Sequence, residues 1–379
     1  MRTVSARSWD RPIKDDDQFA YASARALNYT NNLLTKDNYD DLIYKDSDFT
    51  TWVSWWARTF NAGNYEVQDT IRETILRGAE QNNRLLRELS WDSQLADILL
   101  LGIDYHNAKV MLKSYILTVK LGEYVNQEQH RRNRDMAELL KTNSNVFMKD
   151  GNTSIDVLAD FMARTLLEES GTGLDERLAK HLSRAVAKIK DIDINAKADL
   201  LASVDRVLNQ EYFLHFLELC DDKENASYRE LLLDYISIKA DSSNLQSFVR
   251  TKLYDLDPVH FQREFVSGGA ISFEDYADYL LYDKEDLKKH DILKDHKSLI
   301  GDLIDLLNKD LDEFLRKFSI TRDKLYLRLA NRGKSLIYGA DLIFSLWMRN
   351  RIEEINLRTI LALHEQGVDR DEIAAHLRV

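Results

Sequence analysis

The 379-residue sequence contains little proline, glycine or cysteine. It has two prolines, Pro12 and Pro258, and 13 glycines, so few positions oblige the chain to leave a helix. Cys220 is the only cysteine, which excludes an internal disulfide and a metal site built from paired cysteines. These scarcities favour helix over most of the chain and a reducing compartment.

Long hydrophobic runs and an excess of positive charge are also missing. The most apolar run, residues 98–103, is far shorter than the roughly 18 residues that a membrane span requires, and the N-terminus lacks the apolar core of a signal peptide. The 52 basic residues are outnumbered by 64 acidic ones, and the net charge of -12 would repel a phosphate backbone. We therefore expect no transmembrane segment and no nucleic-acid partner, and any membrane association to go through another protein.

Apolar residues recur every three or four positions from Phe19 onward. This spacing is typical of amphipathic helices packed on one another, and no segment shows the alternation of a strand. Helix starts are indicated where an acid follows a polar side chain by three positions, as in a capping box. These pairs are Ser227 with Glu230, Ser272 with Asp275, and Asp369 with Glu372. The sequence therefore predicts an all-α fold.

A short pattern occurs three times: an acid, an asparagine three positions later, then a basic or amide side chain two positions after the asparagine. The copies are Asp104, Asn107 and Lys109; Asp241, Asn244 and Gln246; and Glu353, Asn356 and Arg358. Residues 21–27 are a degenerate fourth copy. On a helix the acid and the asparagine share one face, so the pattern predicts equivalent polar stripes that contact a partner. Chance recurrence in a charged helical protein is the alternative.

The tripeptide Gly333, Lys334 and Ser335 ends like a phosphate-binding loop. That loop also needs a glycine five residues earlier and a preceding strand, and Arg328 occupies the earlier position. We therefore expect a turn between two helices and no nucleotide site.

Two other sets could supply part of a metal site. They are Glu211, His215 and Glu218 on one helical face, and His290 with His296 among acids. Neither completes a ligand shell, so we expect solvated faces with salt bridges. Aspartate pairs at residues 16–17, 40–41 and 221–222 lack the third acid of the DDxxD motif that holds magnesium in helical terpenoid synthases, and caps or turns explain them. We expect no catalytic residue, cofactor or metal.

Two local features could contact a partner. Trp52, Trp55 and Trp56 share a helical face and could anchor one, although such a stripe more often belongs to the core. The basic run at residues 131–134 could touch an acidic protein surface or lipid headgroups. A solvated helix face is the simpler interpretation of that run.

The order and spacing of short motifs resemble the C-subunit family of bacterial and archaeal V-type ATPases, which is similar to the d subunit of the eukaryotic vacuolar enzyme. The motifs are residues 19–27, 33–34, 39–42, 104–109, 241–250, 265–271 and 353–361, with Gly367 and residues 372–373. They extend from Phe19 to the end of the chain, and only the C-terminal motif is specific by itself. Residues 150–198 and the tryptophan-rich segment depart from the usual pattern.

This resemblance implies three related helical domains arranged as a funnel with pseudo-threefold symmetry. We expect domains at residues 1–95, 96–235 and 236–379, with C-terminal helices that can pack back on the first. The resemblance implies a non-catalytic subunit that couples the central stalk to the membrane rotor ring, for proton or sodium transport, at the cytoplasmic face of the membrane. The repeated stripes would then edge the concavity that receives the stalk, and an acidic receiving surface would make binding weaken as salt rises.

Two other classes of protein are alternatives. An unrelated helical-repeat scaffold needs a regular period of about 34 to 47 residues, whereas the asparagines of the pattern are 137 and 112 residues apart. An all-α enzyme of the terpenoid-synthase type would release diphosphate in a magnesium-dependent reaction. Measurement of that release would distinguish an enzyme from a coupling subunit.

Overall fold

The computed structural model describes residues 7–10, 15–44, 71–91, 93–117, 133–141, 146–171, 173–192, 197–287 and 289–379. Within these ranges every regular element is helical, so the predicted all-α fold is confirmed. The elements in chain order are η1 (Asp17–Phe19), α1 (Ala20–Thr30), α2 (Lys36–Tyr44), α4 (Ile71–Leu89), α5 (Leu95–Tyr115), α6 (Asn133–Leu140), α7 (Ile155–Leu166), α8 (Glu176–Lys190), α9 (Lys197–Cys220), η5 (Lys223–Asn225), α10 (Arg229–Leu253), α11 (Pro258–Glu264), α12 (Phe273–Leu280), α13 (Lys284–Leu287), α14 (Gly301–Lys309), α15 (Leu311–Arg332), η6 (Gly333–Ser335), α16 (Ala340–Glu365) and α17 (Arg370–Ala375).

Side chains at the helix starts explain where several helices begin. Ser272 and Asp275 form the predicted capping box of α12, in which each side chain accepts a hydrogen bond from the backbone amide of the other. Asp369 caps α17 by accepting a hydrogen bond from the amide of Asp371. The prediction at Ser227 is wrong, because α10 begins at Arg229 after the N-cap residue Tyr228.

The segment Gly333–Ser335 is a 3-10 helix that joins α15 to α16. It is the turn between helices that the sequence predicts. A Cβ atom on Gly333 would lie 2.4 Å from the carbonyl oxygen of Asp341. Glycine therefore allows α16 to begin close against this turn.

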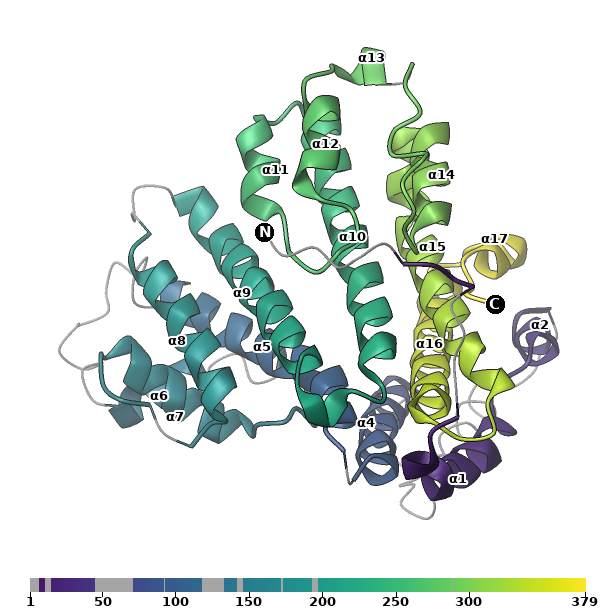
Figure 1. Cartoon of the computed structure of the whole chain (residues 1–379), viewed down its shortest axis with the longest axis horizontal. Helices are drawn as coiled ribbons and strands as arrows, with labels where there is room; N and C mark the ends of the chain where they lie inside the picture. The colour runs from purple at the N-terminus through teal and green to yellow at the C-terminus, as the bar shows by residue number, and fades with distance from the viewer. Residues whose placement is uncertain are drawn as a thin grey trace.

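Figure 1 shows how the helices are grouped in space. Helices α5–α9 lie on the left, α10–α14 extend upward from the centre, and α1, α2, α4, α16 and α17 lie on the right and below. Helix α16 packs against α1, α4 and α15, and α17 packs against α2. The helices at the two ends of the chain therefore pack against each other.

The chain does not break where the second predicted domain boundary was placed. The boundary after residue 235 falls inside α10, and the chain turns at η5, between α9 and α10, instead. The division at residues 1–95, 96–235 and 236–379 stays a prediction. Trp52, Trp55 and Trp56 and the basic run at residues 131–134 lie outside the residues whose side chains the structure describes.

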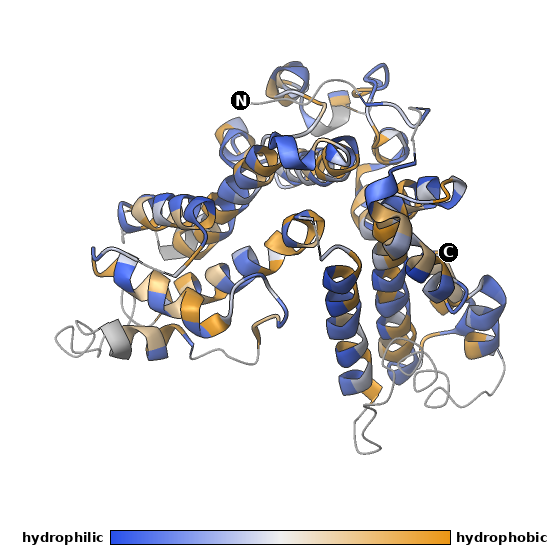
Figure 2. Ribbon diagram, turned by 60° about the horizontal axis from the view of Figure 1, so that its bottom comes forward, coloured by the Kyte–Doolittle hydropathy of each residue, from blue (hydrophilic) through white to orange (hydrophobic). Residues whose placement is uncertain are grey.

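Large aromatic side chains fill the region where α10, α15 and α16 meet. The ring of Tyr235 lies 5.8 Å from that of Phe344 and 6.4 Å from that of Trp347. Figure 2 shows hydrophilic and hydrophobic residues interspersed along the helices, as packing on one face requires. None of the helices in the described ranges combines the length and apolar character needed to cross a bilayer.

A buried ionic group ties the N-terminal segment to this region. Arg7 pairs with Glu230 at 2.6 Å and with Asp234 at 3.4 Å, and Arg332 pairs with the other carboxylate oxygen of Asp234 at 2.9 Å. Asp234 is completely buried. Loss of either arginine would leave a poorly compensated charge in the interior, which is strongly destabilising.

Candidate functional site: three loop clasps

The three acid and asparagine pairs of the repeated pattern lie inside the protein. They occupy interior turns of α5, α10 and α16. Each of the six side chains is at most 5 % exposed. The polar stripes expected from the pattern are therefore interior in this chain, and the contact of these six residues with a partner stays a prediction.

On α5, Asp104 and Asn107 hold the loop that precedes α7. The carboxylate of Asp104 accepts hydrogen bonds from the backbone amides of Asn152 at 3.2 Å and Thr153 at 3.0 Å. The side-chain amide of Asn107 pairs with both backbone groups of Met148, donating to its carbonyl oxygen and accepting from its amide, each at 2.9 Å. Two side chains of one helix thus form hydrogen bonds with four backbone groups of one loop.

On α10, Asp241 and Asn244 repeat the arrangement. Asp241 accepts hydrogen bonds from the amides of Ala270 at 3.0 Å and Ile271 at 3.1 Å. Asn244 pairs with the carbonyl oxygen and the amide of Val266, both at 2.9 Å. We call this arrangement of a buried acid and asparagine with a loop backbone a loop clasp.

The two loops agree residue by residue. In each, the partner of the asparagine stands three residues before a glycine, and the N-cap residue of the next helix stands three residues after it. These residues are Met148, Gly151 and Ser154 in the first loop, and Val266, Gly269 and Ser272 in the second. A Cβ atom would lie 2.6 Å from Asp104 Oδ1 at Gly151 and 1.9 Å from Asp241 Oδ1 at Gly269. Each glycine lets the loop backbone reach the acid.

The third clasp, on α16, is completed by two segments far apart in sequence, one before α2 and one after α17. Asn356 pairs with the carbonyl oxygen of Arg378 at 3.1 Å and with its amide at 3.0 Å. Glu353 accepts a hydrogen bond at 2.5 Å from the amide of Leu34, just before α2. The loop that is continuous in the other clasps is here divided between the C-terminus and the N-terminal region.

Burial raises the pKa values of the acids in the first two clasps. It raises the pKa of Asp104 to about 6, although the hydrogen bonds from Thr153 and Asn152 act in the opposite direction. It raises the pKa of Asp241 to about 7, against the hydrogen bonds from Ala270 and Ile271. These carboxyl groups serve as buried acceptors for backbone amides.

The third residue of each copy lies nearer the surface. Lys109 and Gln246 are partly exposed and Arg358 is exposed. Lys109 donates a hydrogen bond to Asn209, and Arg358 pairs with Glu354 at 2.6 Å. These three residues stay predicted contacts with a partner.

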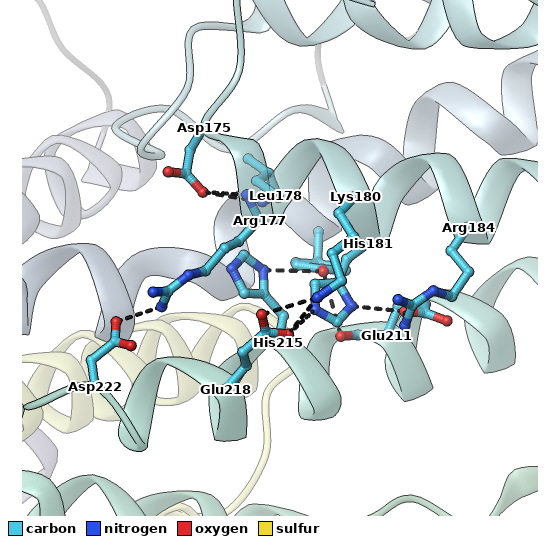
Figure 3. Close-up of polar contacts among 11 residues, drawn as sticks. Asp175, Arg177, Leu178, Lys180, His181, Arg184, Glu211, His215, Glu218 and Asp222 are labelled. Atoms are coloured by element: carbon cyan, nitrogen blue, oxygen red, sulfur yellow. Dashed lines mark hydrogen bonds and ion pairs between the residues drawn. The ribbon is translucent and has the colours of Figure 1, made fainter.

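A second polar cluster joins α8 to α9 (Figure 3). His181 lies between two carboxylates, with Nδ1 2.8 Å from Glu211 and Nε2 3.1 Å from Glu218. Glu211 and His215 are at most 2 % exposed, so the prediction that they lie on a solvated face is wrong. They are buried because α8 packs against α9, and His181, 30 residues from Glu211 in sequence, was not predicted.

The cluster keeps Glu211 ionised and His215 neutral. Burial disfavours ionisation of Glu211, but hydrogen bonds from His181 and Lys188 outweigh it and lower the pKa of this carboxyl. Burial and the neighbouring His181 lower the pKa of His215 to about 4. The two imidazole rings stack at 4.8 Å, and Tyr105 of α5 lies 3.3 Å from Nδ1 of His215. The cluster thus links three helices.

Other residues considered from the sequence have local roles. His290 stacks on Tyr282, and His296 pairs with Asp275 at 3.2 Å. Asp16 caps η1, and Asp222 pairs with Arg177. Across the described ranges, no three His, Cys, Asp or Glu side chains come together in a way that could hold a metal ion.

Comparison with known proteins identifies one family. A family model described as ATP synthase (C/AC39) subunit matches residues 22–376. The match includes all three acid and asparagine pairs. No curated protein matches the chain.

Replacement of Asp241 by alanine tests the clasp. We expect Asp241→Ala to lower the free energy of unfolding by about 2 to 3 kcal/mol, because the amides of Ala270 and Ile271 lose their acceptor inside the protein. Asp278→Ala, at an exposed position on α12, is the control and should change it by less than about 0.5 kcal/mol. Urea unfolding followed by circular dichroism measures both. Equal stability of the two variants would contradict the role assigned to Asp241.

The clasp glycines provide a second test. Gly151→Ala and Gly269→Ala should destabilise the protein, because the added methyl group collides with the clasp acid. Gly301→Ala, where a Cβ atom meets nothing within 4 Å, should be neutral or stabilise α14 by up to about 1 kcal/mol. Thermal unfolding of the three variants compares them directly. Tolerance of alanine at both clasp positions would show that the loops do not need close approach.

His215 should make stability depend on pH. Since its pKa is about 4 in the folded protein and 6.5 ordinarily, its contribution is complete above pH 6.5 and is lost as the pH falls toward 4. Between pH 7 and pH 5 this loss is about 2 kcal/mol. His215→Asn should therefore be less sensitive to pH over this interval, and the exposed control His364→Gln should behave like the wild type. Urea unfolding at the two pH values measures the difference, and an unchanged pH dependence in His215→Asn would refute it.

Proposed function

Since this chain belongs to the ATP synthase (C/AC39) subunit family, we propose that it is the non-catalytic subunit that couples the central stalk of a V-type rotary ATPase to the membrane rotor ring. In this role it lies at the cytoplasmic face of the membrane and turns with the rotor. Its partners are the stalk subunits on one side and the ring on the other. The family match over residues 22–376 is the observation that carries the proposal.

The loop clasps support the mechanical part of this role. A coupling subunit must transmit torque without yielding, and tightly packed helical interiors yield little under load. The clasps add directional hydrogen bonds that fix loops to α5, α10 and α16. In the third clasp these bonds also hold the segment before α2 and the segment after α17. A load applied at one partner surface can therefore reach the other through the packed body.

The clasps also support three related units around a common centre. Tyr235 stands six residues before Asp241, and Trp347 stands six residues before Glu353, so they occupy equivalent positions on α10 and α16. Their rings lie 6.4 Å apart. We propose that the three units form the funnel that the sequence resemblance implies, with the stalk held in its mouth. Lys109, Gln246 and Arg358 are the proposed contacts at its edge.

An ATPase assembled with and without this subunit tests the coupling role. We expect membranes that contain the complete enzyme to transport ions on addition of ATP. In enzyme that lacks this chain, the catalytic sector should still hydrolyse ATP, but ATP-driven ion transport should be lost because rotation no longer reaches the ring. Hydrolysis is measured as phosphate release, and transport with an ion-gradient dye.

Two further measurements serve as controls. Adding back the purified chain should restore transport, and the surface variant His364→Gln should restore it equally well. Full ion transport without the chain would overturn the proposal. Magnesium-dependent release of diphosphate by the purified chain would instead support an enzyme of the terpenoid-synthase type.

A further inference from the structure

Four cationic side chains gather near the middle of the long helices. We call Lys109 of α5, Lys239 of α10, Arg322 of α15 and Arg351 of α16 the cationic patch. The Nζ of Lys239 lies 5.9 Å from the centre of the Tyr235 ring, that ring lies 6.4 Å from the ring of Trp347, and the guanidinium of Arg351 lies 5.6 Å from the centre of the Trp347 ring. The charges of Arg351, Lys109 and Arg322 contribute to the lowered pKa of Lys239. Arg351 is exposed and the other three are partly exposed.

Lys239 lies at a junction of three helices. Its Nζ donates a hydrogen bond to the hydroxyl of Tyr212 on α9 at 2.9 Å and lies 4.2 Å from the centre of that ring. A Cβ atom on Gly102 of α5 would lie 3.8 Å from the same Nζ. Gly102, Lys239 and Arg351 each stand two residues before a clasp acid. Equivalent positions of the three units therefore supply a glycine, against which Lys239 packs, and two cations.

The charge of Asp205 acts on Lys109, and that of Arg351 acts on Glu354, but neither carboxylate forms an ion pair with these cations among the described residues. Among the residues that the structure describes, Lys239 and Arg351 form no ion pair, and Lys109 donates only to the neutral amide of Asn209. Arg322 pairs with Asp323, which Arg378 also binds. Cations elsewhere on the surface are commonly paired within one helical turn, as Lys294 is with Asp291. Three of the four cations, Lys109, Lys239 and Arg351, thus have no ion pair within the described residues, although the chain has a net charge of -12.

The surroundings make the charge of Lys239 unfavourable unless an anion approaches. Burial lowers the pKa of Lys239 to about 7, and the neighbouring cations contribute to this shift. An anion beside Lys239 would offset both effects, since an opposite charge favours the protonated lysine. The guanidinium of Arg351 is positioned by Trp347, since it lies 5.6 Å from the centre of that ring. Attraction of an anion would thus cost little rearrangement.

We propose that the cationic patch binds an acidic, carboxylate-bearing segment of the central stalk. This inference rests on the proposed function for the identity of the partner, and on the charges above for its chemistry. It replaces the expectation of an acidic receiving surface. The negative charge of the chain as a whole disfavours nucleic acid. The position of the patch near the middle of helices, beside buried aromatic rings, favours a projecting protein segment over a flat lipid surface.

Charge reversal tests the patch in the full-length chain. Binding is measured by biolayer interferometry with two probes, the purified central stalk subcomplex and an oligoglutamate peptide. We expect Lys239→Glu/Arg351→Glu to weaken binding of both probes tenfold or more. The control Lys36→Glu/Arg263→Glu changes the net charge equally at exposed positions that form no ion pair within the described residues, and should bind within twofold of the wild type.

Salt dependence and milder variants complete the experiment. Wild-type affinity should fall as salt rises, and the affinity of the reversed variant should fall less steeply. Lys239→Gln and Arg351→Glu are tested singly, with circular dichroism as a check on folding, so that loss of binding is separated from loss of structure. Both should weaken binding of the stalk.

The outcomes distinguish this inference from the proposed function. Tight stalk binding that is unchanged by charge reversal would overturn the patch and leave the coupling role intact. Failure of the wild type to bind the stalk, with patch-dependent binding of oligoglutamate, would overturn the coupling role and support the patch chemistry. Patch-dependent binding to phosphatidylserine vesicles without binding to either protein probe would overturn the inference in favour of a lipid partner.

Discussion

The described structure depends on a buried asparagine that pairs with both backbone groups of one loop residue. Loops that enter the interior of an all-helical protein have no strand ladder to satisfy their amides and carbonyl groups, and such groups are rarely left unpaired. Asn107, Asn244 and Asn356 solve this problem at three places with the same geometry. The acid one turn earlier takes further amides of the adjoining backbone. A helix thereby fixes a loop that packing alone would hold loosely.

The third clasp shows how a repeated unit can be assembled from segments that are far apart in sequence. In the first two units the helix, the loop and the next helix follow one another in sequence. In the third, α16 meets Arg378 near the C-terminus and Leu34 near the N-terminus. Helix α16 also packs against α1 and α4, so the N-terminal and C-terminal helices are held together by packing as well as by these hydrogen bonds. The repeated unit is thus continuous in space although the chain is interrupted within it.

The fold class and the repeated positions could be predicted from the sequence, but their environment could not. Spacing of three residues places Asp241 and Asn244 on one face of a helix, yet it does not reveal whether that face meets water or a loop. Whether this face is buried depends on Val266, Ala270 and Ile271, which lie in a loop further along the chain, after α11. The periodicity of the helix gives no information about where that loop packs. For the same reason Glu211 was expected to be solvated, because its partner His181 belongs to a different helix. In both cases the polar character of the residues favoured a position at the surface, whereas the packing of other segments over them makes the position interior.

The clasps also explain why cations remain unpaired on the same helices. Residues two apart on a helix point to nearly opposite sides, so Lys239 and Arg351 face away from Asp241 and Glu353. Those acids are occupied by loop amides and cannot turn to neutralise the cations. Because Asp241 and Glu353 bind loop amides in the interior, their negative charges lie on the opposite sides of α10 and α16 from Lys239 and Arg351. The hydrogen bonds that fix the loops to α10 and α16 thus engage the acids nearest in sequence to Lys239 and Arg351.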